Sequence, residues 1–286
     1  MMRWYPAPAK LNLFLHVVGR RADGYHLLQT VFRLIDRCDQ VGVALREDGE
    51  LRRTDRLPGV GEESDLCLRA AKLLKEEATA RLGARAPTLG ADIGLRKELP
   101  LGGGLGGGSS DAATVLLVLN RLWKLDWRRA ELQALALRLG ADVPLFVFGR
   151  SALGEGVGER LSALSLEPAW YLVLLPQVSV STKEIFSDAA LTRNTKPLKI
   201  PPFFAGQGRN DLEEVTSRRY PEIRAQLAAL RQYCKDARMT GSGACVFAEF
   251  ASEAGALAVQ SKLPETMRGF VARGLERHPL YDWGID

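Results

Sequence analysis

The glycine-rich segment at residues 100–110 constrains the fold of this chain more than any other segment. Six of its eleven residues are glycine, which adopts positive φ angles and lets the backbone approach a ligand closely. A predicted strand at 92–98 precedes it, and Ser-Ser-Asp, with helix N-cap chemistry, begins a helix predicted over about 111–122. Unpaired N–H groups at such a helix N-terminus attract phosphate. The segment therefore predicts a cradle for a nucleoside triphosphate.

Neighbouring residues exclude two other classes of glycine loop. The spacing Gly102-x-Gly104-x-x-Gly107 fits the dinucleotide fingerprint, which requires a following strand and an acidic residue about 20 positions on. Asp126 has that spacing but lies between two predicted helices, so NAD binding is excluded. A Walker A loop ends in Gly-Lys-Ser/Thr, whereas this loop has no lysine. A flexible linker is disfavoured, because a strand and a capped helix bound the loop.

Length, charge and cysteine content limit the class of protein. The 286 residues suffice for two domains, and a glycine-rich stretch at 149–158 predicts their junction, giving units 1–158 and 159–286. The formal charge is +5 with dispersed lysines and arginines, which favours a small anionic ligand over nucleic acid. The four cysteines form no CxxC pair, and neither a membrane-length apolar run nor a signal peptide is present. We therefore expect a cytoplasmic protein without a disulfide scaffold or zinc site.

Hydrophobic patterning predicts helices and strands without a regular βαβ count, which indicates the α+β class. Helices are predicted at 66–77, 128–139 and 221–233, and a long surface loop at 187–210. Residues 9–18 alternate as a strand with two distinct faces. The apolar face carries Leu11, Leu13, Leu15 and Val17, and the other face carries Lys10, Asn12, Phe14 and His16.

Five sequence blocks resemble the GHMP kinase superfamily, named for galactokinase, homoserine kinase, mevalonate kinase and phosphomevalonate kinase. Gly-Leu-Gly-Gly-Gly-Ser-Ser at 104–110 is similar to its glycine loop, and Met-Thr-Gly-Ser-Gly-Ala-Cys-Val-Phe-Ala at 239–248 to its second, C-terminal glycine loop. Pro-Ala-Lys-Leu-Asn-Leu-Phe-Leu at 8–15, Gly-Arg-Arg-Ala-Asp-Gly-Tyr-His at 19–26 and Gly-Ala-Asp-Val-Pro at 140–144 resemble the members that phosphorylate a cytidyl diphosphate sugar alcohol.

This resemblance implies a two-domain fold, with a ribosomal protein S5 domain 2-like N-terminal domain and a ferredoxin-like C-terminal domain. It implies transfer of the ATP γ-phosphate to the 2-hydroxyl of that sugar alcohol, a step in non-mevalonate isoprenoid precursor synthesis, with ATP and Mg²⁺ as cofactors. The implied partner is a small-molecule substrate, without nucleic acid or membrane, and the protein would act as a monomer or homodimer. The alternatives are another GHMP kinase, of homoserine or mevalonate type, and a non-catalytic nucleotide- or RNA-binding module.

Phosphoryl transfer to a hydroxyl needs a group that accepts the hydroxyl proton and a means of neutralising charge. The resemblance implies that Asp142 is the catalytic base and that Lys10 is its partner. A lysine at that position would stabilise the charged carboxylate and the transferring phosphoryl group. Taken alone, Asp142 would be interpreted as a helix N-cap and Lys10 as an exposed strand residue.

The remaining expected site residues divide between nucleotide and substrate. The nucleotide side comprises Pro100, Leu101, Gly102, Gly103, Gly104, Leu105, Gly106, Gly107, Gly108, Ser109, Ser110 and, for adenine, Lys97. Ser109 and Ser110 could contact phosphate or a metal ion, or they could cap the helix, and the sequence does not separate these roles. No side chain is assigned as a metal ligand. Relatives often have an asparagine for adenine where this chain has Asp65, which accepts hydrogen bonds but does not donate them when ionised.

For the substrate side, the resemblance implies that Tyr25 and Phe186 stack on the two faces of cytosine and that His26 bonds its edge. Stacking on an aromatic ring is worth roughly 1–3 kcal/mol per base. Asn12 would orient the acceptor hydroxyl, and Gly241 and Ser242 of the second glycine loop would close over phosphate or substrate. Without the resemblance, Phe186 would be interpreted as core and His26 as a turn residue.

Overall fold

A computed structural model describes residues 1–55, 61–83, 88–200, 203 and 206–286. Helices and strands follow one another in short runs without regular alternation, which is the order of an α+β protein and confirms the predicted class. In the described part of the chain, no helix is both long and apolar enough to cross a lipid bilayer.

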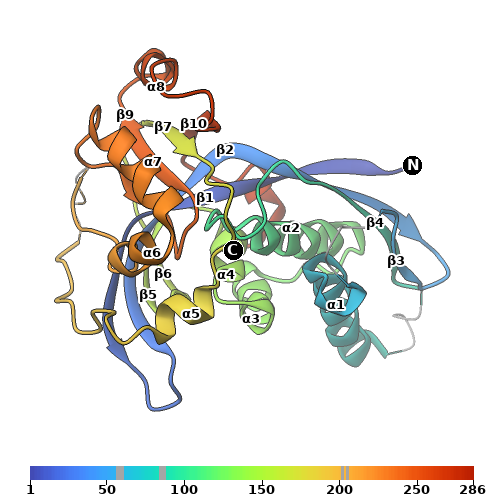
Figure 1. Ribbon diagram of the computed structural model, residues 1–286. Helices are drawn as coiled ribbons and strands as arrows, with labels where there is room; N and C mark the ends of the chain where they lie inside the picture. Colours follow the sequence, from blue (N-terminus) through green and yellow to red (C-terminus); the bar gives the residue numbers. More distant parts are fainter. Residues whose placement is uncertain (56–60, 84–87, 201–202, 204–205) are drawn as a thin grey trace.

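Two long antiparallel strands form the frame of the molecule. They are β1 (Arg3–Arg20) and β2 (His26–Arg46), which pair along almost their whole lengths and cross the molecule together in Figure 1. Three strands share the second edge of β2, in order along it: β5 (Ala152–Gly156), β10 (Gly269–Leu275) and β4 (Gly90–Arg96). The short strands β3 (Leu51–Arg53) and β6 (Arg160–Ala163) extend the sheet beyond β4 and β5. Strand β2 therefore joins both halves of the chain in one sheet.

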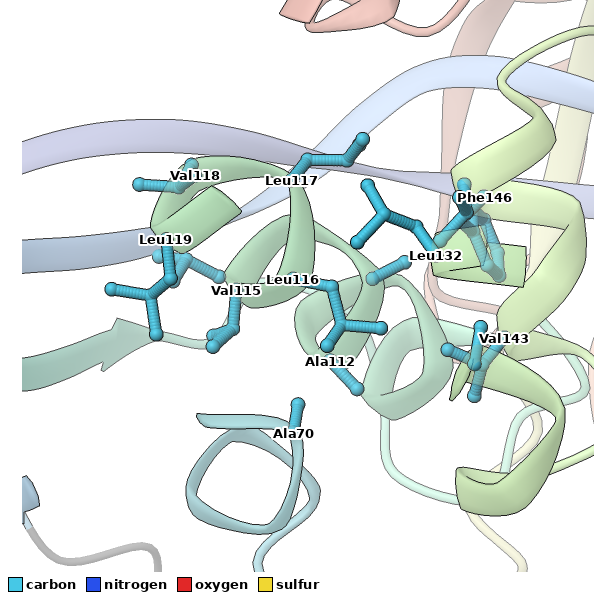
Figure 2. Packing of buried hydrophobic residues seen from close by; sticks show 14 of the residues in the cluster. Ala70, Ala112, Val115, Leu116, Leu117, Val118, Leu119, Leu132, Val143 and Phe146 are labelled. Carbon is cyan, nitrogen blue, oxygen red and sulfur yellow. The ribbon is translucent and has the colours of Figure 1, made fainter. Parts of the chain in front are cut away.

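The helices of the N-terminal half pack around one buried helix. They are α1 (Leu66–Leu82), α2 (Gly107–Leu122), α3 (Arg129–Leu139) and α4 (Val143–Phe148). Every residue of α2 from Ser110 to Asn120 is buried, since α2 lies under β1 and β2 with the other helices around it. Figure 2 shows Leu116 of α2 amid Ala70 of α1, Leu132 of α3 and Val143 of α4, all in one hydrophobic cluster.

The C-terminal half follows a β-α-β-β-α-β order. Its elements are β7 (Trp170–Leu174), α5 (Thr182–Ser187), α6 (Glu213–Arg219), α7 (Pro221–Arg231), β8 (Arg238–Met239), β9 (Val246–Phe250), α8 (Glu253–Gln260) and β10. The strand order β10-β7-β9-β8 is antiparallel throughout, which is the ferredoxin-like arrangement that the resemblance implied.

The two faces of β1 exchange in the middle of the strand, and the predicted alternation is wrong beyond residue 13. The register with β2 shifts between Asn12 and Phe14, so Leu13 is an extra residue in a β-bulge. A one-residue shift moves every later side chain to the opposite face. Phe14 accordingly packs in the same cluster as Leu11, whereas Leu15 turns to the face that carries Lys10.

Helix α2 begins earlier than predicted. Its first residue is Gly107, not Asp111, and Gly106 at the N-cap has a φ of 72° that favours glycine. No side chain caps this end. The serines predicted as caps therefore lie inside the first turn, and the glycines supply the conformational freedom that the entry into the helix needs.

Other expected boundaries are met to within a few residues. Helices α1, α3 and α7 begin at 66, 129 and 221, as the patterning predicted. The predicted loop at 187–210 contains no helix or strand after α5 among its described residues, and 201, 202, 204 and 205 lie outside them. The division after residue 158 falls in the turn between the paired strands β5 and β6, and it stays a prediction.

The last ten residues, 277–286, form a segment that returns to the N-terminal half and that we call the C-terminal strap. The Arg129 side chain is almost fully buried beneath it. Its guanidinium donates to the carbonyls of Tyr281 and Gly284 in the strap, at 2.9 and 3.3 Å, and to Val147 of α4 at 2.9 Å. The strap therefore fastens the start of α3 to α4.

His278 lies in this strap with its side chain 2% exposed. Its Nδ1 accepts a hydrogen bond from the Leu280 amide at 3.0 Å. Burial, with a smaller contribution from Arg129, lowers the pKa of His278 to about 3. The native protein thus holds this imidazole neutral.

We expect His278 to make stability fall in mild acid. Its folded pKa lies below the unfolded value near 6.5, so the unfolded chain binds more protons as the pH falls through 6.5 and native stability is lost. Between pH 7 and pH 5 the loss from this group is about 2 kcal/mol. Urea unfolding of wild type and His278→Gln at both pH values measures it. Equal losses in the two proteins would show that His278 is not the titrating group.

Candidate active site

A cleft of about 770 Å³ lies where the two halves of the chain meet. Its walls come from β1, the β1–β2 turn, the first glycine loop, the start of α4, the α5 region and the second glycine loop. Of the residues expected from the sequence, it is lined by Lys10, Asn12, Tyr25, His26, Gly102, Gly104, Ser109, Asp142, Phe186, Gly241 and Ser242. Segments far apart in the sequence therefore contribute to one cavity.

Lys10 and Asp142 face each other in this cleft. The Lys10 ammonium lies 3.4 Å from Asp142 Oδ2, with the lysine side chain 3% exposed and the aspartate 37% exposed. Asp142 occupies the N-cap position of α4, yet its carboxylate makes no capping hydrogen bond. The lysine is buried and oriented, and the carboxylate remains open to a ligand.

Asn12 holds the lysine in place. Its Oδ1 accepts a hydrogen bond from Lys10 Nζ at 2.5 Å, and its Nδ2 donates to Thr30 Oγ1 at 2.9 Å. The backbone amide of Asn12 donates to Thr240 Oγ1 at 3.0 Å. Sequence reasoning gave Thr240 no role of its own, although it stands directly before the Gly-Ser-Gly of the second loop.

The first glycine loop is docked by its carbonyl groups. Leu105 O accepts from the Lys10 amide at 2.9 Å, and Gly103 O accepts from the Cys245 amide at 3.1 Å. Thr240 Oγ1 donates to Gly104 O at 3.3 Å. These hydrogen bonds to its carbonyl groups fix the position of the loop between β1 and the second glycine loop.

Only part of the first loop lines the cleft. Gly102, Gly104 and Ser109 do, whereas Leu105 is 1% exposed and packs in a hydrophobic cluster. Ser110 is fully buried, and its Oγ has no partner in the described part of the chain. The other expected members, which do not line the cleft, are Pro100, Leu101, Gly103, Gly106, Gly107 and Gly108.

Lys97 lies behind the loop and does not line the cleft. Its ammonium binds the buried carboxylates of Asp39 and, at 3.0 Å, Asp111. Burial lowers the Lys97 pKa, but Asp111 and Asp39 outweigh it and the net pKa is raised. Burial raises the pKa of Asp111 to about 7 against the pull of Lys97. This cluster supports the first turn of α2, since a Cβ on Gly107 would lie 3.0 Å from Lys97 Nζ; an adenine contact by Lys97 stays a prediction.

Both carboxylate oxygens of Asp65 accept hydrogen bonds from other residues of the chain. Its Oδ1 accepts from the amides of Cys67 and Leu68 and so caps α1, and its Oδ2 accepts from Arg53 at 2.6 Å. These bonds occupy the carboxylate, which is 6% exposed. They explain an aspartate at this position without any adenine contact.

The far end of the cleft is aromatic. The rings of His26 and Phe186 lie 4.9 Å apart with an angle of 35° between their planes. Tyr25 beside them is 63% exposed. An exposed tyrosine next to two ordered rings provides surfaces on which a planar base can stack.

The second glycine loop is anchored by Asn210, in the long loop before α6, and by Thr182, the first residue of α5. Asn210 Nδ2 donates to the carbonyls of Met239 and Gly241, each at 2.8 Å. The hydroxyl groups of Ser242 and Thr182 lie 2.7 Å apart. Sequence reasoning missed Asn210 and Thr182, because nothing in the sequence marks which polar side chain contacts the second glycine loop.

Family models match both halves of the chain. The model described as GHMP kinases N terminal domain matches residues 65–150, and that described as GHMP kinases C terminal matches residues 202–269. A protein of Thiobacillus denitrificans called 4-diphosphocytidyl-2-C-methyl-D-erythritol kinase is 62% identical over 99% of this chain and 99% of its own length. The Nitrosospira multiformis protein of the same name is 60% identical over 97% of this chain and 93% of its own length.

Solved structures agree with these matches. A 4-(cytidine 5'-diphospho)-2C-methyl-D-erythritol kinase superimposes with a TM-score of 0.78 at 34% identity, covering 96% of this chain and 99% of the other. A homoserine kinase of Cytophaga hutchinsonii has a TM-score of 0.69 at 18% identity, with 97% and 95% covered. The homoserine kinase shares the fold alone.

We expect Gly104→Ala to destabilise the docking of the two glycine loops. Gly104 has a φ of +75°, and a Cβ there would overlap the carbonyl oxygen of Thr240 and lie 3.0 Å from that of Gly243. The strain should cost about 2 kcal/mol or more in urea unfolding. Gly108→Ala is the matched control, since its Cβ would meet nothing closer than 3.5 Å and alanine favours a helix. Equal midpoints for Gly104→Ala and wild type would contradict the docking.

Proposed function

The chain belongs to the 4-diphosphocytidyl-2-C-methyl-D-erythritol kinases within the GHMP kinases, and on that premise we propose its reaction. It transfers the γ-phosphate of ATP to the 2-hydroxyl of 4-diphosphocytidyl-2-C-methyl-D-erythritol. As an ATP-dependent small-molecule kinase, it is not the non-catalytic module that the sequence left open.

One observation supports this proposal above the others. The Lys10–Asp142 pair, with 3.4 Å between its charged atoms, lies in the same cleft as the first glycine loop and the aromatic group of Tyr25, His26 and Phe186. A phosphate-binding end, a charged pair and a base-stacking end in one cavity suit a bisubstrate reaction in which a phosphoryl group moves between two nucleotide-containing molecules.

In this proposal Asp142 accepts the proton of the acceptor hydroxyl as the oxygen attacks the γ-phosphorus, and the bond from that phosphorus to the β–γ bridging oxygen breaks, so that ADP leaves. Its carboxylate makes no capping hydrogen bond and is partly exposed to the cleft, so it is free to bond a substrate hydroxyl. Asn12, bonded to Lys10, Thr30 and Thr240, keeps the neighbouring groups in fixed positions.

The positive charge of Lys10 then acts on two groups. It stabilises the carboxylate of Asp142 before the reaction and the equatorial phosphoryl oxygens during transfer. The start of α2, where Ser109 lines the cleft, provides N–H donors for the other phosphates. Because Leu105, Gly103 and Gly104 have their carbonyls bonded elsewhere, the loop can turn its amides toward the nucleotide.

Magnesium is the metal that phosphoryl transfer generally uses, and it prefers oxygen ligands. Beside the phosphate oxygens of ATP, the cleft offers such a donor in the hydroxyl of Ser109, so the residues present fit the ion. When bound, Mg²⁺ neutralises the negative charge of the β- and γ-phosphates. Ser110, fully buried inside α2, is not suited to this role.

We expect Asp142→Asn and Lys10→Met to lower kcat by a factor of about 10² or more while the proteins remain folded. Asn keeps the shape of the aspartate but removes its basicity, and Met keeps the buried stem of the lysine but removes its charge. Asp126→Asn is the control, because Asp126 is exposed outside the cleft and its φ of 54° suits asparagine. Wild-type turnover in either cleft variant would remove that residue from the mechanism.

A substrate panel tests the acceptor. ADP release should be fast with ATP and the cytidyl substrate, and at background level with homoserine or mevalonate. The reverse order would favour the homoserine- or mevalonate-type alternative, whose members share this fold.

A further inference from the structure

Arg193 connects the two aromatic segments of the substrate end. It lies in the loop after α5, and its Nε donates to His26 Nε2 at 3.0 Å. Its terminal nitrogens donate to the carbonyls of Phe186 at 3.0 Å, Asp188 at 2.7 Å and Leu191 at 3.0 Å. One guanidinium therefore sets the position of the His26 ring relative to the segment that carries Phe186.

The bond from Arg193 also determines where the proton of His26 resides. A guanidinium is always a donor, so Nε2 of His26 must accept and carries no hydrogen. The neutral ring then has its hydrogen on Nδ1. No bond to His26 Nδ1 occurs within the described part of the chain, and His26 lines the cleft, so this N–H is available to a ligand.

The charge environment agrees with a neutral ring. Burial lowers the pKa of His26, and the nearby cations Arg193 and Arg20 lower it further. An imidazolium would also place an N–H against the Nε–H of Arg193, where two donors face each other. Both considerations disfavour the doubly protonated form of His26.

We propose that Arg193 is a positioning residue that makes the cleft selective for cytosine over uracil. This inference rests on the proposed function, because it takes the base of the substrate to lie between the rings at this end. Cytosine presents an acceptor at ring nitrogen N3, which the Nδ1–H of His26 can bond. Uracil presents an N–H at the same position, and two donors would then face each other without a bond.

The tautomer is tested first, without any substrate. Long-range ¹H–¹⁵N correlation spectra distinguish Nδ1–H from Nε2–H imidazoles, and the chain has only three histidines. His26→Gln identifies the signal of His26. We expect the Nδ1–H form in wild type and a shift toward the Nε2–H form in Arg193→Met. An Nε2–H ring in wild type, or an unchanged ring in Arg193→Met, would overturn the proposal.

Selectivity is tested by kinetics with the cytidyl substrate and its uridyl analogue. Wild type should favour the cytidyl substrate in kcat/KM by at least about tenfold, and Arg193→Met should lose most of that preference, mainly through a higher KM for the cytidyl substrate. Arg224→Met is the matched control, since Arg224 is exposed on α7 and away from the cleft. A preference that survives in Arg193→Met would overturn the proposal.

These outcomes separate this inference from the proposed function. If wild type phosphorylates neither substrate, the proposed function fails, although the spectra still report whether Arg193 fixes the ring. If wild type phosphorylates the cytidyl substrate and Arg193→Met keeps wild-type discrimination, the function stands and the role of Arg193 is refuted.

Discussion

The backbone of the central segment of β1 is hydrogen-bonded to both glycine loops, and the rest of the site depends on these two bonds. The Lys10 amide bonds Leu105 of the first loop, and two residues later the Asn12 amide bonds the Thr240 hydroxyl at the start of the second. The side chains of the same two residues face the cleft and bond each other. A single stretch of strand thus fixes the phosphate-binding backbone and the charged side chain in one frame, which flexible loops alone would not achieve.

The bulge at Leu13 lets β1 serve both the cleft and the hydrophobic core of the C-terminal half. Before it, Lys10 and Asn12 face the cleft; after it, the apolar Leu15 continues that face, while Phe14 moves into the core behind. A regular strand would have placed Phe14 and His16 next on the face that carries Lys10 and Asn12. The extra residue therefore ends the polar row after Asn12 and lets the same strand continue as a buried part of the C-terminal half.

Local chemistry was predictable where the signal lies within a few neighbouring residues. The glycine loop and the helix after Asp142 were both accessible from the sequence. The bulge was not, because alternation gives no sign of an inserted residue. Nor could the ion pairs of Lys97 be predicted, because its partners are Asp39, fifty-eight positions away, and Asp111 in the first turns of α2. Both require knowledge of which strands are neighbours.

The shared edge of β2 affects how this protein can change over evolutionary time. Its positions 28–32, 34–35 and 40–46 each pair with a different strand, and β10 comes from the far end of the chain. A deletion within β2 would shift pairings in both halves together, whereas surface loops elsewhere can lengthen freely. The halves are thus not interchangeable modules: a chimera that takes its C-terminal half from a relative must also take a β10 that fits the resident β2.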